Sequence, residues 1–523
     1  MSSNEIEWSS FNPVGNEAQY LQDAFASGWV SAGSYVEKLE SELDRVYAGS
    51  HSFAVSNGTS ALQLAFQTLG VKPGDRVIVP AFCFQAAGNV LSQLGAVPVF
   101  CDVDSVTWNQ TLDTIQRAVT EQAVGVVIVH NYGRAAPSAE IVAWARDNGL
   151  WVIEDCAEAW FTRYQNRFVG QFGDVATFSM HATKTIASGE GGVVMINDPS
   201  LKEMVRLLRS HGLNRSKTHY MHELAGNNYR LSNLLSAVAY GQLEQRERIE
   251  ANQKERAKAY KEMLDGHWAL NLQAPIAGAD DNVWAVAVKL KSHLLTVSRD
   301  QLIALLKERG IETRPGFYPA SALAYNAQHL ISNLPVGDAI AKDIIVLPCS
   351  SRLTKNDIKY VCDTLIELLE SARGPASGYE FIDLKSDGSA QAKLERFIST
   401  IAKGNKSFRY FQNRDVDVVR GHDVSVILDI ADEPIGYGHI ETENGVSWLG
   451  IAVSDAHTGK GWGKLIMAHL IEATTHTAIR ILNLKVDQHN VGAIKLYQEN
   501  GFVRVEQKSD DEVSHMEREI VAA

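Results

Sequence analysis

The sequence predicts an α/β protein whose largest part is a mostly parallel sheet covered by helices on both faces. From Phe53 onward, short apolar runs alternate with helical patterns, which is typical of strands buried on both sides. A second, smaller αβ segment follows a long helical run. At 523 residues the chain is long enough for two or three domains, and its 45% hydrophobic and 21% charged residues are typical of a soluble globular enzyme.

The expected elements follow one another in a regular order. Helical patterns open the chain over Glu17–Ser27 and Tyr35–Tyr47. Strands are then expected at Phe53–Ser56, Arg76–Pro80, Val97–Asp102, Val124–Val129, Trp151–Glu154, Val175–Phe178 and Val193–Ile196. The helices between them are expected at Ser60–Leu69, Gln85–Leu94 and Ser138–Asn148. Ligands of such sheets gather beyond the carboxyl ends of the strands, so functional residues are expected there.

Composition excludes several classes of function. A net charge of -13 argues against a general nucleic-acid binder. Five cysteines without regular spacing indicate reduced thiols rather than a disulfide framework. The N-terminus lacks the basic and apolar regions of a signal peptide, and no apolar run is long enough to span a membrane. We therefore expect a cytoplasmic protein with no membrane partner, and no metal site is predicted.

The turn after the first strand offers a phosphate site. Gly58 allows close approach of a ligand to the backbone, and Thr59 and Ser60 place hydroxyls beside the free N–H groups of the next helix. A plain helix N-cap would explain one of these residues equally well.

Two further strand ends carry candidate ligand contacts. Phe84, after the second strand, has a ring that can stack on a flat ligand, although a core position is the simpler interpretation. Asp155, at the end of the fifth strand, can keep a pyridine nitrogen protonated, and Glu158 follows three residues later. A strand-ending aspartate is equally common as a helix cap.

The stretch from Phe178 to Gly192 places Lys184 among small and hydroxyl residues between two apolar strands. Partial burial there lowers the pKa of a lysine and frees a nucleophilic amine for Schiff-base chemistry. A lysine that merely closes a hairpin fits this stretch alone nearly as well.

Taken together, these motifs resemble the fold-type I, pyridoxal 5'-phosphate (PLP)-dependent sugar-nucleotide aminotransferases of the DegT/StrS group. The resemblance runs from about Phe11 to Leu369 and includes the sequence N-N-Y-R-L-S at Asn227–Ser232. It implies a PLP-binding large domain over residues 1–250 and a small domain over 251–373. It also implies a homodimer, because the residues that match Asn228 and Arg230 reach the neighbouring subunit's site in that family.

The same resemblance implies roles for the cofactor residues. Lys184 would carry the Schiff base and Asp155 would pair with the pyridinium nitrogen. Phe84 would stack on the ring, and Thr59, Ser60 and Ser179 would hold the phosphate beside Gly58. Glu158 stands where the family more often has Gln, and its contact with the cofactor is the less certain one. Because relatives that act as dehydratases replace the lysine by histidine, Lys184 favours transamination.

The smaller αβ segment is expected to follow a helical run over Asn233–Leu264. It comprises a strand at Val283–Leu290 and helices at Arg299–Arg309 and Lys355–Ser371. Its sequence E-T-R-P-G-F-Y-P resembles the substrate loop of perosamine-synthase-like enzymes, which aminate C4 of 4-keto-6-deoxyhexose nucleotides. That resemblance implies a substrate contact for Tyr318, whereas Gly316 departs from the bulky residue expected there and leaves the sugar open. The sequence is also an X-Pro turn.

A short linker is predicted at Ala372–Gly378, followed by a third domain over residues 379–523. Strands are expected at Asp423–Asp429, Pro434–Glu441, Ser447–Val453 and Ile481–Val486, with a helix at Leu465–Thr474. Before that helix, Gly459, Gly461 and Gly463 can present N–H groups to a pyrophosphate, although flexible loops share such glycines.

This combination resembles the GNAT N-acetyltransferases over most of Phe408–Phe502. The resemblance implies that the glycine loop with Lys464, the strand end at Val453 and Asn490 bind acetyl-CoA, and that Tyr497 protonates the departing thiolate. A structural role for Tyr497, at helical spacing beside Leu496, stays open. Thr458 replaces the usual Arg or Gln of the glycine motif, and His439 and Glu441 are candidates for the base by position only.

The two modules together predict a bifunctional enzyme of nucleotide-sugar metabolism. The first would aminate a keto-deoxysugar nucleotide with glutamate as the expected donor, and the second would acetylate the new amine, for a surface polysaccharide such as an O-antigen. The alternatives are a transaminase acting at C3 or on a cyclitol, and a C-terminal module that only binds a ligand or partner.

Overall fold

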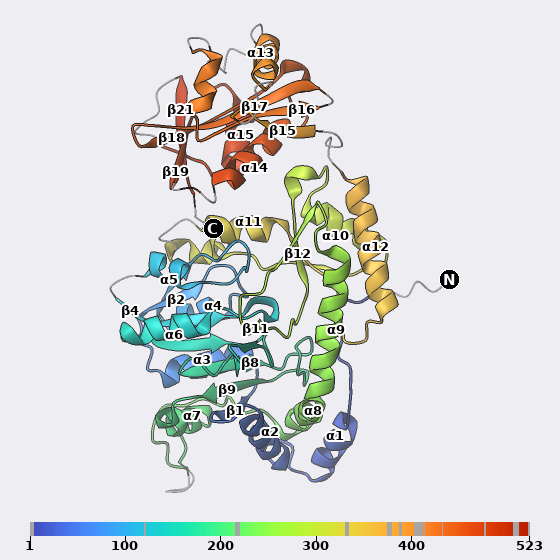
Figure 1. Ribbon diagram of the computed structural model, residues 1–523. Coiled ribbons are helices and arrows are strands. Elements are labelled where there is room, and N and C mark those ends of the chain that lie inside the picture. Colours follow the sequence, from blue (N-terminus) through green and yellow to red (C-terminus); the bar gives the residue numbers. More distant parts are fainter. Residues whose placement is uncertain are drawn as a thin grey trace. The chain divides into compact units, whose positions relative to one another are not determined.

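The computed structural model describes residues 5–119, 122–214, 220–329, 334–373, 379–385, 390–401, 410–411, 414–430, 432–474, 477, 479–505 and 512–520 (Figure 1). The chain forms two compact units. The first comprises Met1–Leu290 and Ser298–Leu368, and the second comprises Lys291–Val297 and Leu369–Ala523. Most of the linker expected at Ala372–Gly378 lies outside the described residues.

The first unit is built on a seven-stranded sheet in the order β1-β9-β8-β5-β4-β2-β3. Its strands are β1 (His51–Val55), β2 (Arg76–Pro80), β3 (Val97–Cys101), β4 (Ala123–Val129), β5 (Trp151–Asp155), β8 (Val175–Ser179) and β9 (Gly192–Ile196). Strand β9 pairs antiparallel with β1 and β8, and the other pairings are parallel. The predicted, largely parallel sheet is confirmed. Because every strand except β9 runs the same way, the carboxyl ends of β1, β2, β5 and β8 share one edge.

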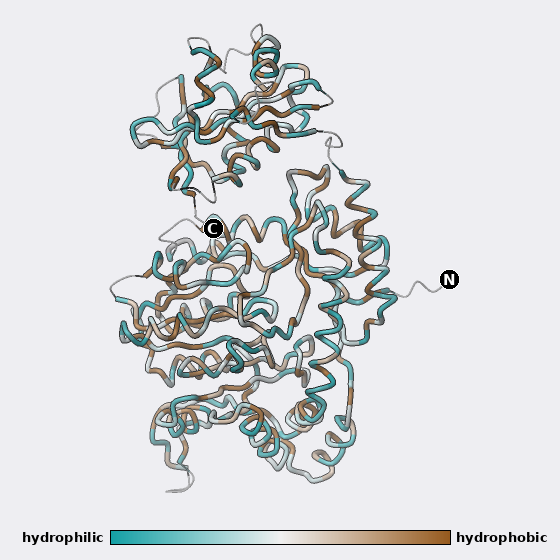
Figure 2. Tube along the Cα trace, viewed as in Figure 1, coloured by the Kyte–Doolittle hydropathy of each residue, from teal (hydrophilic) through white to brown (hydrophobic). Residues whose placement is uncertain are grey.

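Both faces of this sheet are buried, which explains the continuous apolar runs in its sequence. Val77 and Val79 belong to one hydrophobic cluster, whereas Ile78 between them belongs to the cluster on the opposite face. Figure 2 shows the hydrophobic colour along these strands, while the surrounding helices alternate between hydrophobic and hydrophilic. A sheet with two apolar faces needs a helical layer on each side.

Helices supply that cover. They are α2 (Ser34–Val46), α3 (Gly58–Thr68), α4 (Ala86–Gln93), α5 (Leu112–Ala118), α6 (Ser138–Asp147) and α7 (Lys202–Arg209). Helix α1 (Glu17–Ala26) packs instead in a separate small cluster, in which its Ala24 lies with Tyr35 and Ala237. The sequence reasoning missed α5, which has only seven residues and begins with a capping box between Thr111 and Thr114. Short helices give too few apolar repeats for periodicity to detect.

The expected single helical run over Asn233–Leu264 is wrong in one respect, because it consists of two helices. These are α8 (Asn233–Glu244) and α9 (Arg246–Leu264), and Gln245 between them has φ -98° and ψ 14°. Gly241 of α8 leaves no room for a side chain, since a Cβ there would lie 2.9 Å from the backbone nitrogen of Glu17 at the start of α1. This close packing holds α8 against α1, and the chain turns at Gln245 to continue as α9.

The smaller part of the first unit has a four-stranded antiparallel sheet in the order β10-β12-β14-β13. Its strands are β10 (Leu270–Leu272), β12 (Ala287–Leu290), β13 (Arg314–Pro315) and β14 (Ile344–Val346), and its helices are α10 (Arg299–Glu308), α11 (Pro335–Asp343) and α12 (Lys355–Ser371). Strand β12 is shorter than the predicted Val283–Leu290. Three short strands, β6 (Arg163–Tyr164), β7 (Arg167–Phe168) and β11 (Ala279–Asp280), form a separate small sheet. The proposed division near residue 250 stays a prediction, and that position falls within α9.

The second unit is a seven-stranded sheet in the order β15-β16-β17-β18-β19-β21-β20. Its strands are β15 (Tyr379–Asp383), β16 (Val424–Ile430), β17 (Glu433–Glu443), β18 (Val446–Val453), β19 (Ile481–Asp487), β20 (Val503–Arg504) and β21 (Val513–Glu519). Its helices are α13 (Ala390–Ile401), α14 (Trp462–Thr474) and α15 (Val491–Glu499). Neighbouring strands are antiparallel except β18 and β19, which are parallel.

The parallel pair divides this sheet. In the described part of both strands, two residue pairs join them, Ser447 with Leu482 and Trp448 with Asn483. Beyond Trp448 the two strands separate, while each remains fully paired with its other neighbour, β17 or β21.

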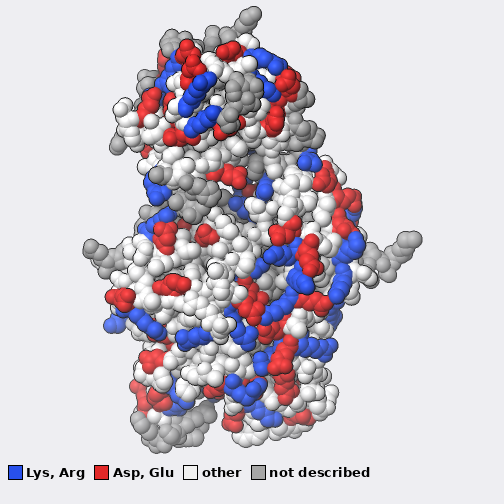
Figure 3. Space-filling model, in the orientation of Figure 1, with Lys and Arg blue, Asp and Glu red and all other residues white. Residues whose placement is uncertain are grey.

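The surface matches the composition. Figure 3 shows basic and acidic residues interspersed over the face in view rather than one continuous basic surface. Within the described ranges, no helix combines the length and the apolar character needed to cross a bilayer.

Candidate active sites

The turn after β1 and the end of β8 form a tight polar cradle. Asn57 caps α3 by accepting a hydrogen bond from the Ser60 N–H at 2.7 Å, and the Ser56 hydroxyl donates to the Ser60 hydroxyl at 3.0 Å. A Cβ at Gly58 would lie 3.0 Å from the Cβ of Ser179. The structure therefore brings Gly58, Ser60 and Ser179 together at the N-terminus of α3, beside Thr59 in its first turn, as a phosphate site requires.

A second glycine keeps this cradle closed. Gly192, at the start of β9, packs so tightly that a Cβ there would lie 2.6 Å from the backbone of Asn57. Gly192 thus has a packing role. It allows β9 to pass close to the turn between β1 and α3.

Asp155 ends β5 as a buried carboxylate. Its Oδ1 accepts one hydrogen bond, from the N–H of Ala157 at 3.0 Å. Its pKa is raised to about 6, chiefly by burial and also by the negative charge of Glu158, whereas the hydrogen bond from Ala157 and the nearby Lys184 and His130 act in the opposite direction. A cation placed against this carboxylate would relieve the penalty of burial, and a pyridinium nitrogen is such a cation.

Lys184 is held between a carboxylate and an aromatic ring. Its Nζ lies 3.2 Å from Oε1 of Glu158 and 3.7 Å from the ring centroid of Trp284. The other carboxylate oxygen of Glu158 accepts the N–H of Tyr132 at 2.7 Å. Trp284 is fixed in turn by its Nε1–H, which donates to the carbonyl of Thr183 at 2.6 Å. Glu158, which stands where the family that the sequence resembles more often has Gln, is thus a direct ionic partner of the lysine.

Trp284 is the residue of this site that sequence reasoning missed. It lies in the stretch expected to be a strand, where an aromatic residue is ordinary. Only the packing of this segment against the loop of Lys184 reveals its role.

The side chains of Phe84 and Tyr318 are both exposed, and the loops that carry them lie close together. Phe84 is 66% exposed, in contrast to the fully buried Phe82, so the core interpretation of Phe84 is wrong. Its ring centroid lies 6.3 Å from that of Phe317, the neighbour of Tyr318. An exposed ring beside the strand ends is available for stacking on a ligand.

Gly316 has a structural explanation. A Cβ there would lie 2.0 Å from Cγ2 of Ile344 and 3.1 Å from the hydroxyl oxygen of Tyr132. The space that a bulky side chain would fill is already taken by these two residues.

Asn228 and Arg230 form a pair beside the cradle. The Nε–H of Arg230 donates to Oδ1 of Asn228 at 2.9 Å, and Tyr229 between them accepts the N–H of Ser56 at 2.7 Å. This places both residues next to the phosphate site of their own chain. Their predicted reach into a neighbouring subunit stays a prediction.

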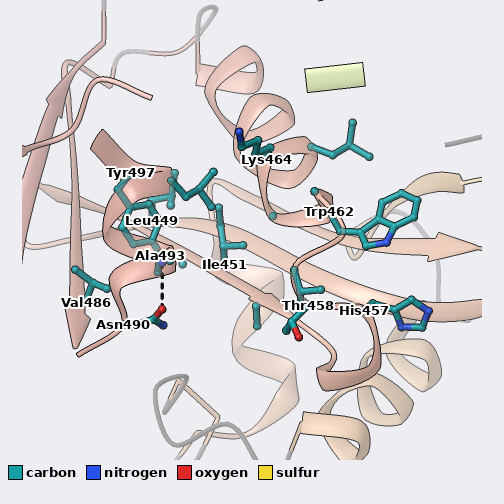
Figure 4. A pocket seen from close by; sticks show the side chains of 18 of the residues that line it. Leu449, Ile451, His457, Thr458, Trp462, Lys464, Val486, Asn490, Ala493 and Tyr497 are labelled. Atoms are coloured by element: carbon teal, nitrogen blue, oxygen red, sulfur yellow. Dashed lines mark hydrogen bonds between the residues drawn. The ribbon is translucent and has the colours of Figure 1, made fainter. Parts of the chain in front are cut away.

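The second unit contains a large cleft where β18 and β19 separate. Its volume is about 1190 Å³, and its walls come from β17, β18, β19, α14, α15 and the loop before α14. Figure 4 shows Leu449 and Ile451 of β18, Val486 of β19 and Tyr497 of α15 projecting into this second-unit cleft. Strand β18 ends at Val453, which also lines it.

The glycine loop forms one end of the cleft. Gly459 and Gly461 adopt positive φ angles of 74° and 87°, which L side chains rarely adopt. Gly463 lies in the first turn of α14, where a Cβ would approach a methyl carbon of Leu496 to 3.3 Å. Thr458 donates its hydroxyl to the carbonyl of Asp455 at 3.0 Å, so its side chain stabilises the turn that precedes the glycines.

The predicted residues of α14 and α15 all line the cleft, with different local partners. Lys464 pairs with Glu499 at 2.9 Å. Asn490 caps α15 by accepting the Ala493 N–H at 3.1 Å, as the dashed line in Figure 4 shows. Burial raises the pKa of Tyr497 to about 12, so its hydroxyl keeps its proton at neutral pH, as an acid requires.

The opposite end of the cleft is lined by ionisable residues. They are Tyr410, Arg414, His439 and Glu441. The Tyr410 hydroxyl lies 2.5 Å from Oε2 of Glu441, and Nη1 of Arg414 lies 2.9 Å from Oε1. The sequence indicated His439 and Glu441 by position only. It gave no sign of Tyr410 and Arg414, which lie between α13 and β16 and carry no recognisable pattern.

Comparison with known proteins identifies both units. Residues 14–366 match the DegT/DnrJ/EryC1/StrS aminotransferase family. The chain belongs to this family. Residues 392–502 match the acetyltransferase (GNAT) family, so a GNAT domain follows the aminotransferase.

The relatives cover the aminotransferase part almost completely. GDP-perosamine synthase of Vibrio cholerae is 35% identical over 354 residues, which are 67% of this chain and 95% of that protein. GDP-perosamine synthase of Escherichia coli O157:H7 is 32% identical and covers 68% of this chain and 96% of its own length. The crystal structure of 3-amino-5-hydroxybenzoic acid synthase has a TM-score of 0.66 and 27% identity, and covers 71% of this chain and all of that one.

The DegT family uses PLP, and the residues present fit it. The cradle at Gly58, Ser60 and Ser179 would suit its phosphate, the buried Asp155 would suit its pyridinium nitrogen, and Lys184 would supply the amine. When bound, PLP serves as the electron sink that labilises a bond at the amine-bearing carbon. The GNAT domain implies acetyl-CoA, for which the second-unit cleft is large enough.

Proposed function

We propose that this chain is a bifunctional enzyme that makes an acetamido sugar nucleotide in two steps. The aminotransferase would convert a 4-keto-6-deoxyhexose nucleotide into the 4-amino sugar, with glutamate as the amino donor. The GNAT domain would then transfer an acetyl group from acetyl-CoA to that amine. The first product is a primary amine, and a primary amine is what an N-acetyltransferase consumes.

The observation that carries this proposal is the presence of two separate sites with complementary chemistry in one chain. The first has its lysine, carboxylate and phosphate cradle in place. The second keeps an open cleft with a protonated tyrosine, Tyr497, at its wall. Similarity to two GDP-perosamine synthases supports a sugar nucleotide as the first substrate.

The structure offers support for individual residue roles. Lys184 would exchange protons between the cofactor and the sugar carbon once it is released from Glu158, its partner at 3.2 Å. Phe84 would stack on the cofactor ring, and Tyr318 would contact the sugar nucleotide. In the cleft, the N–H groups of the glycine loop would bind the pyrophosphate of acetyl-CoA with Lys464. The free edge of β18 up to Val453 would pair with its amide groups, and Asn490 would contact it from α15.

The proposal includes the assembly and the setting of the enzyme. We infer a homodimer in which Asn228 and Arg230 complete the neighbouring site, a cytoplasmic location, and a product destined for surface polysaccharide such as O-antigen.

Mass spectrometry of the products tests the proposal. The purified protein is incubated with keto-sugar nucleotides, glutamate and acetyl-CoA, and a product carrying both the amino and the acetyl group is expected. Product that stops at the free amine, with acetyl-CoA unconsumed, would favour the alternative of a C-terminal module that only binds. Amination at C3, or of a cyclitol, would show instead that the first substrate is assigned wrongly.

A further inference from the structure

The acid of the second-unit cleft has one candidate, Tyr497, but the group that accepts the amine's proton has two. Two candidates, His439 and Glu441, lie two residues apart on β17 and therefore point to the same face of the sheet. Both line the cleft. Their surroundings differ, and the difference decides between them.

Glu441 is occupied by donors. The Tyr410 hydroxyl lies 2.5 Å from Oε2, and Nη1 of Arg414 lies 2.9 Å from Oε1 and 3.0 Å from Oε2. Nε2 of His422 lies 3.4 Å from Oε2. Both carboxylate oxygens therefore already accept hydrogen bonds from the protein. The cluster holds the side chain of Glu441 in place as part of the cleft wall.

His439 is held by packing instead. Its cross-strand partner on β18 is Gly450, and a Cβ there would lie 2.2 Å from Cε1 of the imidazole, so only glycine leaves room for the ring. The rings of Tyr410 and His422 lie 4.1 Å and 4.8 Å from it, centroid to centroid. These contacts fix the orientation of the imidazole without using its nitrogens.

The two nitrogens of His439 are not equivalent. Nδ1 is buried and has no hydrogen-bond partner among the described residues. Since the side chain also lines the cleft, Nε2 is the nitrogen that can meet a ligand. Burial, followed by the nearby His422 and Arg414, lowers the pKa of this imidazole well below its usual value, so the ring is neutral before the reaction.

We propose that His439 is the proton acceptor for the acetyl transfer, with Glu441, Arg414 and Tyr410 as the fixed polar wall that positions the acceptor amine beside it. This rests on the proposed function. The amine nitrogen forms a bond to the thioester carbonyl carbon as the carbon–sulfur bond breaks. The proton lost by nitrogen passes to Nε2 of His439, and the departing sulfur takes the phenolic proton of Tyr497. Solvent then carries the proton from His439 back to Tyr497, which restores both groups.

Chemical rescue tests this assignment. The substrate is the amino-sugar nucleotide that the wild-type chain itself produces. His439→Ala removes the imidazole and leaves a hole against Gly450, and the rate of acetyl transfer is expected to fall by roughly 10²–10⁴-fold with little change in the KM for acetyl-CoA. Added imidazole should restore part of the rate, and substituted imidazoles should restore it according to their pKa.

His422→Ala is the matched control, because it removes a second buried imidazole of the same cluster that does not line the cleft. Its rate should not respond to added imidazole. Should His439→Ala fold poorly, His439→Gln provides the second variant, since it fills much of the space but cannot accept the proton, and it should be as slow.

Three results would overturn the inference. The first is a His439→Gln protein that is as fast as wild type. The second is a slow His439→Ala protein that binds acetyl-CoA normally and gains nothing from imidazole. The third is loss of activity in Glu441→Gln together with a change in the pH profile that is absent in the His439 variants, which would assign the role to Glu441. Wild-type protein that acetylates no amino-sugar nucleotide would instead remove the proposed function, and this inference with it.

Discussion

The buried carboxylate of Asp155 makes the stability of the PLP-free protein depend on pH. Its pKa of about 6 lies above the value of 3.8 for a free aspartate, chiefly because burial disfavours the charged form. For a carboxyl group with a raised pKa, the folded state favours the protonated form over the ionised form. Its contribution to stability is therefore complete below pH 3.8 and is lost as the pH rises through 6.

The size of this effect follows from the shift. A difference of about two pKa units corresponds to about 3 kcal/mol between the two protonation states. The asparagine in Asp155→Asn cannot ionise, so this variant should lose none of this stability as the pH rises. Relative to the PLP-free wild type, the variant should gain about 3 kcal/mol in unfolding free energy between pH 4 and pH 7.

The assay is denaturant-dependent hydrogen exchange of peptides from β5 and β8, which reports on the first unit separately from the second. PLP-bound wild type supplies the comparison, because the pyridinium charge should compensate Asp155 and flatten the pH dependence. An Asp155→Asn protein whose pH dependence parallels that of PLP-free wild type would refute the reasoning, since some other group would then be responsible.

Four further outcomes are expected. Borohydride should fix a pyridoxyl group on Lys184, and label on another lysine would contradict the assignment. Lys184→Ala should abolish transamination, while a supplied amino-sugar nucleotide is still acetylated. Tyr497→Phe should leave transamination intact and slow acetyl transfer by roughly 10²–10⁴-fold; an unchanged rate would show that another group is the acid. Mixed dimers of Lys184→Ala and Asn228→Ala chains should regain transamination activity, and failure of verified mixed dimers would argue against a shared site. Gly316→Ala should destabilise the first unit by about 1–3 kcal/mol, because its Cβ would overlap Ile344. Gly421→Ala, in the second unit, has no atoms within 4 Å of the new Cβ and should leave the stability of its own unit unchanged. A Gly316→Ala protein whose first unit is as stable as that of wild type would contradict this.

The sequence was most informative where a local pattern and a chemical requirement coincide. The strands of the large sheet could be predicted because residues such as Val77, Ile78 and Val79 are apolar on both faces. The position of the strand-end residues at one edge of the sheet could be predicted because the carboxyl ends of parallel strands lie together. Lys184 stood out because a lone lysine between two buried strands needs an explanation.

What could not be predicted depends on contacts between distant segments. Trp284 contacts Lys184 although about one hundred residues separate them in the sequence, and no local pattern near either residue predicts this contact. Tyr410 and Arg414 reach Glu441 from an irregular stretch without periodicity. The break at Gln245 could not be predicted because each side has good helical sequence, and the close packing of α8 on α1 involves a segment more than two hundred residues away.

The separation of β18 from β19 has a consequence for handling the protein. A strand with one unpaired side is normally a feature of a sheet's rim, where it can recruit a strand from another molecule. Here such a rim lies inside the sheet, along residues 449–453, and the wall of the cleft around it includes the apolar Leu449 and Ile451. A bound molecule with amide groups would satisfy these backbone donors and acceptors and shield the apolar side chains. Preparations stripped of acyl-CoA should therefore self-associate on storage more readily than saturated ones, and coenzyme A in the buffer should suppress that association.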